Sequence, residues 1–281
     1  MEKLTKDSVV ELYNRVKVPI IGFGGGDIDE NHEKQTMVIR NAIEAGYRHF
    51  DTAAIYHSER SIGEAIRESG IDREQFFITS KVWDADMRRG QVDILRSFEE
   101  SLKRLQTDYI DLYLLHWPVT GKTVETWKTL ELLYYTGRVR ALGLSNVKRH
   151  HFVEIMRNCD VMPHVQQDEF SPWCMNNDVR KFDAFHGIRY EAMMPLKRLK
   201  YEKKDGVLGK IAGNHGKSLQ QVVLRWILQH GIVALPKSQN PKRMRENLDV
   251  FDFSLSPEEM TKIDGLNFEG PINWDPDLFD F

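Results

Sequence analysis

Short apolar runs alternate with longer amphipathic runs along this chain, at intervals of roughly 30 residues. Several of the apolar runs, such as Leu112–Leu115, contain no polar residue, which is typical of strands that are buried on both faces of a sheet. The longer runs carry apolar residues at helical spacing, as in the stretch from Ile94 to Leu105. This alternation predicts repeated βαβ units and therefore a parallel sheet.

Eight strand–helix units match the closed (β/α)8 barrel, or TIM barrel, in which active sites lie at the C-terminal ends of the strands. The predicted strands are Val18–Phe23, Arg48–Asp51, Phe76–Lys81, Ile110–His116, Arg140–Ser145, His164–Gln167, Ile188–Met193 and Ile232–Pro236. No linker rich in Pro, Gly or Ser divides the chain, so we expect one domain over residues 1–281. We also expect a short N-terminal hairpin at about residues 8–18 and an aperiodic tail at about 267–281.

Composition excludes several other classes of protein. Lys and Arg total 39 against 42 Asp and Glu, so the formal charge of −3 offers no basic excess for binding a nucleic-acid backbone. No apolar stretch approaches the ~18 residues of a membrane span, and the N-terminal residues lack the apolar core of a signal peptide. Cys159 and Cys174 are too few for a disulfide framework or a zinc quartet. We therefore expect a cytoplasmic protein that uses no metal, nucleic acid or membrane.

Polar residues end several of the predicted apolar strands, where packing alone does not explain them. Asp51 ends the second strand, and Tyr56 lies just beyond it. Lys81 ends the third strand and His116 the fourth. Further polar residues follow later strands: Ser145, Asn146, Gln167, Lys237 and Ser238. A barrel would bring all of these side chains to one rim.

The first four of these residues suggest a reaction class. A lysine beside Tyr56 would favour the phenolate and lower the tyrosine pKa from its usual ~10. Asp51 would keep Lys81 charged, and His116 could orient a carbonyl oxygen. An acid with neither a nucleophile nor a metal-ligand set beside it suits carbonyl reduction, for which a cofactor must supply hydride.

Each of these residues alone also fits a structural role. Asp51 and Lys81 could form only an ion pair, and His116 could be an ordinary buried histidine. Their combination with Tyr56 favours a catalytic site. The glycines of Gly22–Gly26 lack the spacing of a dinucleotide-binding fingerprint, which excludes that fold. Trp127 and Trp226 lie on apolar helix faces and are expected in the core, whereas His150 and His151 are expected on a helix surface.

Six segments of the chain resemble motifs of the aldo-keto reductase family, and they occur in the family's order. The segments are Gly46–Tyr56 with Glu59 and Gly63, Ile78–Trp83, Leu114–Pro118, Gly143–Asn146, Gln166–Glu169 and Leu235–Ser238. Together they extend the resemblance from residue 18 to about residue 267. The resemblance is greatest to the branch of 2,5-diketogluconate reductases and prostaglandin F synthases.

The resemblance implies a catalytic tetrad of Asp51, Tyr56, Lys81 and His116, in which Tyr56 is the general acid that reduction of an aldehyde or ketone requires. It implies that NADPH is the cofactor, a small-molecule carbonyl compound the substrate, and a monomer the oligomeric state. Residues implied to bind the cofactor are Gly24, Ser145, Asn146, Gln167, Met193, Leu196, Arg198, Lys237, Ser238, Arg243, Glu246 and Asn247. Residues implied to border the substrate are Gly26, Trp83, His116 and Trp117. Lys237, Ser238 and Arg243 also suit a 2′-phosphate electrostatically, whereas Lys242 and Arg245 are expected to be solvated.

The chain departs from the family pattern at three places. Met193 stands where the family usually carries a Tyr or Trp that stacks on the nicotinamide. Gly25 and Gly26 replace bulkier residues beside the substrate pocket, which predicts a wide or adaptable pocket. The basic segment Lys197–Lys204 is either a solvated loop or a clamp over the cofactor pyrophosphate.

Two other functions are compatible with a barrel of this kind. One is a non-catalytic member of the same family that binds NADPH and reports redox state to a partner. The other is an isomerase or lyase on an unrelated barrel, which would be active without a nicotinamide. Turnover of NADPH with aldehydes, abolished by Tyr56→Phe, would separate the reductase from both.

Overall fold

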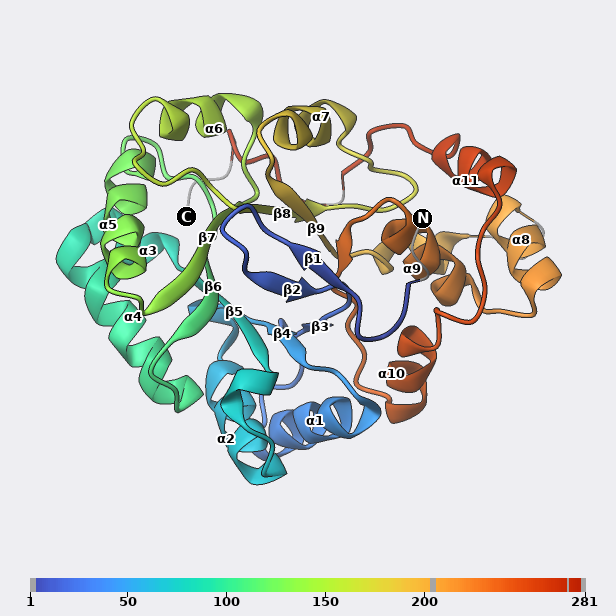
Figure 1. Ribbon diagram of the computed structural model, residues 1–281, viewed down its shortest axis with the longest axis horizontal. Helices are drawn as coiled ribbons and strands as arrows, with labels where there is room; N and C mark the ends of the chain where they lie inside the picture. Colours follow the sequence, from blue (N-terminus) through green and yellow to red (C-terminus); the bar gives the residue numbers. More distant parts are fainter. Residues whose placement is uncertain (1–3, 203–205, 272, 279–281) are drawn as a thin grey trace.

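The computed structural model describes residues 4–202, 206–271 and 273–278. Its centre is an eight-stranded parallel sheet in the order β10-β9-β8-β7-β6-β5-β4-β3, so strands that follow one another in sequence are neighbours. A bridge between Ile21 and Ala234 joins the two ends of the sheet. Helices surround this sheet, as Figure 1 shows. The predicted (β/α)8 barrel is confirmed.

The strands are short, and the parallel strands β3 to β10 end near the rim that carries the predicted site. They are β1 (Val9–Glu11), β2 (Lys17–Pro19), β3 (Phe23–Gly24), β4 (His49–Asp51), β5 (Phe77–Val82), β6 (Ile110–Leu115), β7 (Val139–Ser145), β8 (Val165–Glu169), β9 (Arg189–Met193) and β10 (Val233–Ala234). The α-helices are α1 (His32–Ala45), α2 (Glu59–Ser69), α3 (Asp84–Arg89), α4 (Gln91–Leu105), α5 (Thr123–Tyr135), α6 (Arg149–Met156), α7 (Asn177–Phe185), α8 (Val207–His215), α9 (Leu219–Gln229), α10 (Pro241–Leu248) and α11 (Pro257–Asp264). Three short 3-10 helices are η1 (Ala54–Tyr56), η2 (Arg73–Gln75) and η3 (Lys197–Tyr201).

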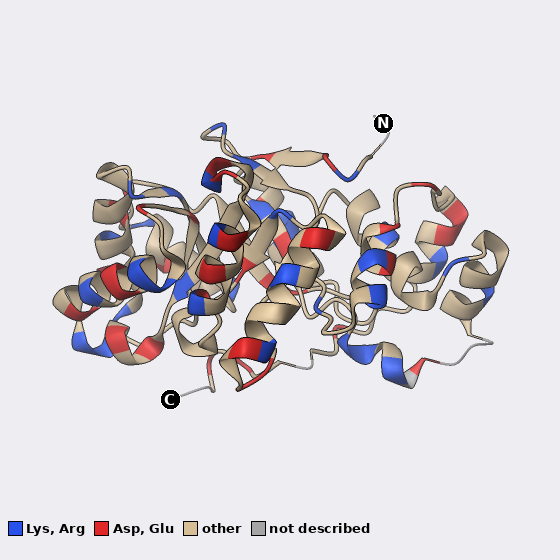
Figure 2. Ribbon diagram, turned by 90° about the horizontal axis from the view of Figure 1, so that it is seen from below, with Lys and Arg blue, Asp and Glu red and all other residues tan. Residues whose placement is uncertain are grey.

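The N-terminal hairpin is confirmed, but the predicted first barrel strand was too long. Strands β1 and β2 pair antiparallel, with Val10 opposite Val18. The apolar run Val18–Phe23 is therefore shared, because its first two residues belong to the hairpin and its last residue to β3. The hairpin lies across one end of the barrel (Figure 1). Figure 2 shows the two ends of the chain on opposite faces of the molecule.

Helix boundaries follow local chemistry that the sequence already indicated. Asn31 begins α1, and its side chain accepts a hydrogen bond from the backbone N–H of Lys34. Gly46 ends the helix at φ 112°, a left-handed conformation that favours glycine. Trp127 and Trp226 are buried in the core, as predicted, and Trp226 stacks on Phe170 with ring centroids 4.9 Å apart. Across the described part of the chain, every helix is too short or too polar to cross a bilayer.

Candidate active site

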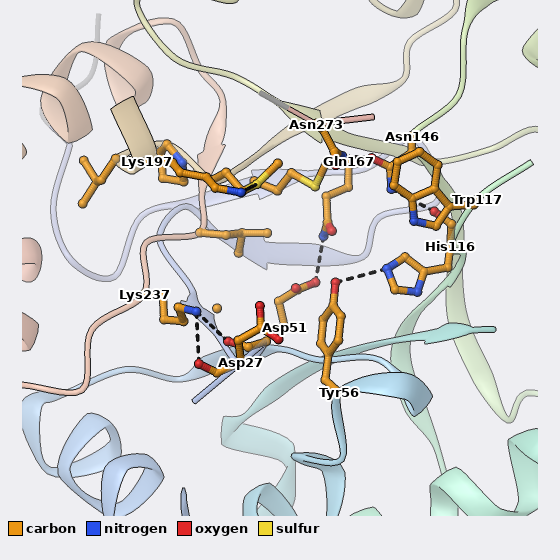
Figure 3. A pocket seen from close by; sticks show the side chains of 17 residues that line it. Asp27, Asp51, Tyr56, His116, Trp117, Asn146, Gln167, Lys197, Lys237 and Asn273 are labelled. Carbon is orange, nitrogen blue, oxygen red and sulfur yellow. Dashed lines mark hydrogen bonds between the residues drawn. The ribbon is translucent and has the colours of Figure 1, made fainter. Parts of the chain in front are cut away.

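A cavity of about 440 Å³ opens where the parallel strands end. Most of the residues predicted to bind cofactor or substrate line it, as Figure 3 shows. The lining residues are Gly24, Gly26, Asp27, Asp51, Tyr56, His116, Trp117, Asn146, Gln167, Met193, Met194, Pro195, Leu196, Lys197, Leu235, Lys237 and Asn273. This position matches the face of a (β/α)8 barrel at which active sites are found.

A buried ion pair lies at the side of the cavity. Asp51 is the last residue of β4, and Lys81 lies on the neighbouring strand β5. The Nζ atom of Lys81 is 2.8 Å from each carboxylate oxygen of Asp51 and 2.8 Å from the carbonyl oxygen of Thr52. Three acceptors around one buried ammonium fix both its charge and its position.

Tyr56 and His116 line the cavity side by side and are in contact. The hydroxyl group of Tyr56 lies 3.1 Å from Nε2 of His116, and the two rings meet edge to face. The Lys81 ammonium lies 5.2 Å from the centre of the Tyr56 ring. His57 follows at φ 56°, a left-handed conformation that is uncommon outside glycine. The end of η1 therefore carries backbone strain where it presents the tyrosine.

The protonation states of these two groups follow from burial. Burial, followed by the negative charge of Asp51, raises the pKa of Tyr56 well above its usual value. The expectation that Lys81 lowers this pKa is therefore corrected, because the sequence does not reveal how completely the ring is enclosed. Burial and the charge of Lys81 lower the pKa of His116 well below its usual value. At neutral pH the site holds a protonated phenol beside a neutral imidazole.

Three side chains predicted to hold the nicotinamide carboxamide lie on the opposite strands. Nε2 of Gln167 donates to Oδ2 of Asp51 at 2.7 Å and to Oε2 of Glu191 at 3.0 Å. Asn146 has φ 56°, and its Nδ2 donates to the His116 carbonyl oxygen at 2.9 Å and to Oγ of Ser145 at 3.0 Å. These contacts leave the side-chain oxygen of Gln167 as an available acceptor, whereas that of Asn146 already accepts a hydrogen bond from Asn273.

The residues predicted to bind the 2′-phosphate gather at the start of α10. Nε of Arg243 lies 3.4 Å from Oγ of Ser238. Ser238 precedes α10 and Arg243 lies in its first turn, where the side chain of Asn240 caps the N-terminal amides. Lys237 donates to the carbonyl oxygens of Gly26 and Asp27 at 2.9 and 3.2 Å. Two cations, a hydroxyl group and a helix N-terminus suit a phosphate dianion.

The two residues predicted near the adenine differ in accessibility. Glu246 is half-buried and lies 3.9 Å from Lys242. Asn247 is buried, and its side chain hydrogen-bonds to Tyr47, which leaves it little room to contact a ligand.

The predicted substrate residues fall into two groups. Gly26 and Trp117 line the cavity, whereas Trp83 packs behind it, edge to face on His116 with centroids 5.3 Å apart. A Cβ atom on Gly26 would lie 3.3 Å from the Tyr56 ring, so the absent side chain leaves that ring uncovered. Gly25 differs, because a Cβ atom there would lie 2.8 Å from the Asp51 carbonyl oxygen. Only Gly26 therefore widens the pocket as expected.

The first part of the basic segment Lys197–Lys204, predicted to be a solvated loop or a clamp, forms the 3-10 helix η3. Lys197 lines the cavity, but Arg198 donates to the carbonyl oxygens of Gly270 and Pro271 and packs on the Phe268 ring. In this structure Arg198 therefore holds the C-terminal tail rather than an open phosphate site. Lys203 and Lys204 lie outside the described residues.

Sequence reasoning missed the contribution of this tail. Nδ2 of Asn273 donates to Oδ1 of Asn146 at 2.6 Å, and its backbone N–H donates to Glu169 at 3.0 Å. The tail is anchored further along, where Asp277 contacts Lys148 at 2.7 Å and His150 at 2.9 Å. His150 and His151 lie on α6, and their contacts with Asp277 were not predicted from the sequence. An aperiodic tail gives no pattern from which these contacts could be inferred.

His150 and His151 both contact Asp277, and burial lowers the pKa of His151 to about 4, so this ring is a neutral hydrogen-bond donor at neutral pH. Nδ1 of His151 accepts the backbone N–H of Lys148, so the ring proton lies on Nε2, which faces Asp277 at 3.3 Å. The ammonium group of Lys148 also contacts Asp275 and Asp277. The positive charges at the start of α6 thus hold two carboxylates of the tail.

Comparison with known proteins decides the family. The model of the aldo/keto reductase family matches residues 20–267. The chain belongs to this family. It is 46% identical over 272 residues to the glyoxal reductase of Bacillus subtilis (strain 168), covering 97% of each chain. It is also 46% identical over 272 residues to the 9,11-endoperoxide prostaglandin H2 reductase of Trypanosoma cruzi (strain CL Brener), covering 96% of this chain and 95% of that one.

A solved structure similar to this chain supports the same assignment in three dimensions. The crystal structure of the Gox0644 D53A mutant in complex with NADPH superposes with a TM-score of 0.91 at 36% identity, covering 98% of this chain and 99% of that one. The chain is therefore an oxidoreductase of the aldo-keto reductase family, whose similar members include named reductases and a structure with a bound nicotinamide cofactor.

Proposed function

We propose that this aldo-keto reductase uses NADPH to reduce aldehydes or ketones to alcohols, with Tyr56 as the general acid. The observation that carries the proposal is the contact of the Tyr56 hydroxyl group with Nε2 of His116, at 3.1 Å, on the wall of the cavity. Small dicarbonyl compounds are the first substrates to test, because a relative of 46% identity is named glyoxal reductase.

The donor set fits a phosphorylated nicotinamide cofactor. Lys237, Ser238 and Arg243 supply two cations and a hydroxyl group at the start of α10, which suits the 2′-phosphate that distinguishes NADPH from NADH. Gln167 and Asn146 offer side-chain oxygens to the carboxamide at the other end of the cavity. Met193 and Leu196 supply apolar wall between the two ends.

When bound, NADPH supplies the hydride that reduces the carbonyl carbon and leaves as NADP⁺. His116, neutral because burial lowers its pKa, donates a hydrogen bond from its ring N–H to the substrate oxygen without adding charge. Tyr56 transfers its phenolic proton to that oxygen and completes the alcohol. Solvent then returns a proton to the phenolate left behind, whose ring centre lies 5.2 Å from the Lys81 ammonium held by Asp51.

The experiment is an absorbance assay at 340 nm with NADPH, glyoxal and a panel of larger aldehydes. We expect turnover, and we expect Tyr56→Phe to lower kcat by roughly 1,000-fold while NADPH still binds. Binding of NADPH without turnover of any aldehyde would instead support a non-catalytic family member. Activity that persists without nicotinamide would favour an isomerase or lyase.

Cofactor preference is tested by a matched pair of arginine variants on α10. We expect Arg243→Ala to weaken NADPH binding roughly 10-fold and to leave NADH binding unchanged, because only NADPH carries the 2′-phosphate. Arg245→Ala, an exposed position on the same helix, is the control and should change neither affinity. Equal losses for both cofactors in the Arg243 variant would contradict the assignment.

A further inference from the structure

Glu191 is a buried carboxyl group that no step of the proposed reaction uses. It lies on β9 and is fully buried. Its Oε2 accepts a hydrogen bond from Nε2 of Gln167 at 3.0 Å, and its Oε1 has no partner in the part of the chain that the structure describes. A carboxyl group in such surroundings costs free energy unless another interaction offsets it. Because Glu191 contacts Gln167, which lines the cavity, we consider what its hydrogen bond does for Gln167.

The strand register places Glu191 beside Gln167. The two residues are directly paired in the parallel ladder of β8 and β9, so their side chains lie next to each other on the same face of the sheet. Gln167 also reaches Asp51 on β4, at 2.7 Å. One amide nitrogen therefore bridges the catalytic carboxylate and Glu191 (Figure 3 shows the contact with Asp51).

These contacts determine which way the Gln167 amide points. Asp51 is paired with the Lys81 ammonium and can only accept hydrogen bonds, so the atom of Gln167 that faces it must be the amide nitrogen. Glu191 then receives the second N–H of the same nitrogen. Oε1 of Gln167 is left on the side of the cavity, and none of the described residues donates a hydrogen bond to it.

Glu191 can accept the hydrogen bond of the Gln167 amide without adding charge to the site. Burial, and next the charge of Asp51, raise its pKa to about 8, while the hydrogen bond from Gln167 and the charge of Lys81 act in the opposite direction. Its partner in register on β10 is Val233, which is apolar. At neutral pH Glu191 is therefore an uncharged acid, whose carbonyl oxygen accepts from Gln167 and leaves the Asp51–Lys81 pair undisturbed.

We propose that Glu191 is a positioning residue, which holds the Gln167 amide with its oxygen toward the cavity as the acceptor for the carboxamide N–H of the nicotinamide. The proposal rests on the proposed function, because it needs a nicotinamide at this wall. Without Glu191, the second N–H of Gln167 loses its partner, and the single hydrogen bond to Asp51 holds the amide at one point instead of two, so the amide plane can tilt about that bond. The acceptor is then no longer fixed.

The test compares NADP⁺ with its 3-acetylpyridine analogue, which has a methyl group in place of the carboxamide nitrogen. Dissociation constants are measured for wild type, Glu191→Leu and Glu191→Gln. We expect the Leu variant to bind NADP⁺ roughly 10-fold more weakly and the analogue as wild type does, because only NADP⁺ can donate to Gln167. The Gln variant keeps a side-chain acceptor and should keep the preference of wild type for NADP⁺.

Steady-state kinetics and a second buried acid provide the controls. In the Leu variant KM for NADPH should rise, with KM for the aldehyde unchanged. Asp183→Asn alters a buried carboxyl group on α7, away from the cavity lining, and should leave both dissociation constants unchanged. If Glu191→Leu does not fold, Glu191→Met, which is closer in length, takes its place.

The outcomes separate this inference from the function on which it rests. A Leu or Met variant that discriminates NADP⁺ from the analogue as wild type does would overturn the role of Glu191 and leave the reductase intact. Equal weakening of both ligands would also overturn it, because that result indicates general damage to the site. A wild-type protein that binds neither NADP⁺ nor NADPH would overturn the proposed function itself.

Discussion

The Nζ atom of Lys81 is equidistant, at 2.8 Å, from the two carboxylate oxygens of Asp51. Both side chains are buried, so each charge depends on the other for its solvation. The same carboxylate also accepts the amide of Gln167, at 2.7 Å. One buried anion thus orients the lysine on β5 and the glutamine on β8, which face the cavity from different sides.

Breaking this ion pair should affect stability and activity differently. We expect Asp51→Asn to lower the free energy of unfolding by about 3 kcal/mol, because Lys81 is left buried without its counter-charge. Activity should fall at least 100-fold. The double variant Asp51→Leu/Lys81→Met should regain most of the stability but remain inactive. Urea denaturation and the 340 nm assay measure the two effects, and a double variant as unstable as the single one would contradict this explanation.

Asp183 on α7 should make stability depend on pH. Burial, and next the charge of Asp168, raise its pKa to about 8, and neither carboxyl oxygen has a partner among the described residues. Because the folded-state pKa exceeds the unfolded value of ~3.9, its contribution is fully present below pH ~4 and is lost as pH rises through 8.

The variant Asp183→Asn should therefore exceed wild type in Tm by more at pH 8.5 than at pH 5, and we expect the two gains to differ by roughly 5 °C. Thermal unfolding followed by circular dichroism at both pH values measures this difference. Glu44→Gln, at an exposed position on α1, is the control and should show no such difference. A Tm gain of the same size at both pH values would show that relief of a buried charge is not the cause.

The adjacent glycines should respond oppositely to one added methyl group. We expect Gly25→Ala to lower the free energy of unfolding by about 2 kcal/mol, because its Cβ would lie 2.8 Å from the Asp51 carbonyl oxygen. Gly26→Ala should retain wild-type stability and raise KM for bulky aldehydes more than for glyoxal, because its Cβ would cover part of the Tyr56 ring. Equal effects on stability would contradict the different environments of the two positions.

Asn273 should compete with the cofactor for Asn146. The two side chains are hydrogen-bonded at 2.6 Å through the oxygen of Asn146 that is proposed to accept from the carboxamide. We expect Asn273→Ala to tighten NADPH binding by roughly 3-fold, measured by quenching of tryptophan fluorescence. Weaker binding would mean that Asn273 contacts the cofactor itself.

Replacing Met193 with an aromatic residue should increase the affinity for NADPH. Met193 lines the cavity but offers no flat surface to a nicotinamide ring. We expect Met193→Trp to tighten NADPH binding by roughly 5-fold through ring stacking. Unchanged affinity in a fluorescence titration would show that this side chain does not face the ring.

The barrel and the polar part of the cavity lining could be predicted from local pattern, whereas Gly24, Met193 and Leu196 were expected only from the family resemblance. Strand periodicity located β4 to β10, and polar residues after apolar runs marked Asp51, Lys81 and His116. The division of Val18–Phe23 between hairpin and barrel could not be predicted, since an apolar run does not specify which neighbour it pairs with.

Properties that depend on distant contacts were also beyond sequence reasoning. The pKa of Tyr56 is set by how completely other elements enclose it, and that enclosure outweighs the nearby Lys81. Glu191 gave a weak signal, since it is an acidic residue inside a predicted strand, but its pairing with Gln167 required the strand register. Asn273 gave none, because its partner lies 127 positions earlier.

The tail contacts have a consequence for the order in which the protein matures. Residues 268–278 leave the ribosome after all eight barrel strands, yet Asn273 lies in the wall of the cavity and Asp277 fastens the tail to α6. A nascent chain can therefore close its barrel while this wall is still missing. Since the hairpin and the tail lie on opposite faces (Figure 2), a purification tag fused ahead of the hairpin is attached on the face away from that last step.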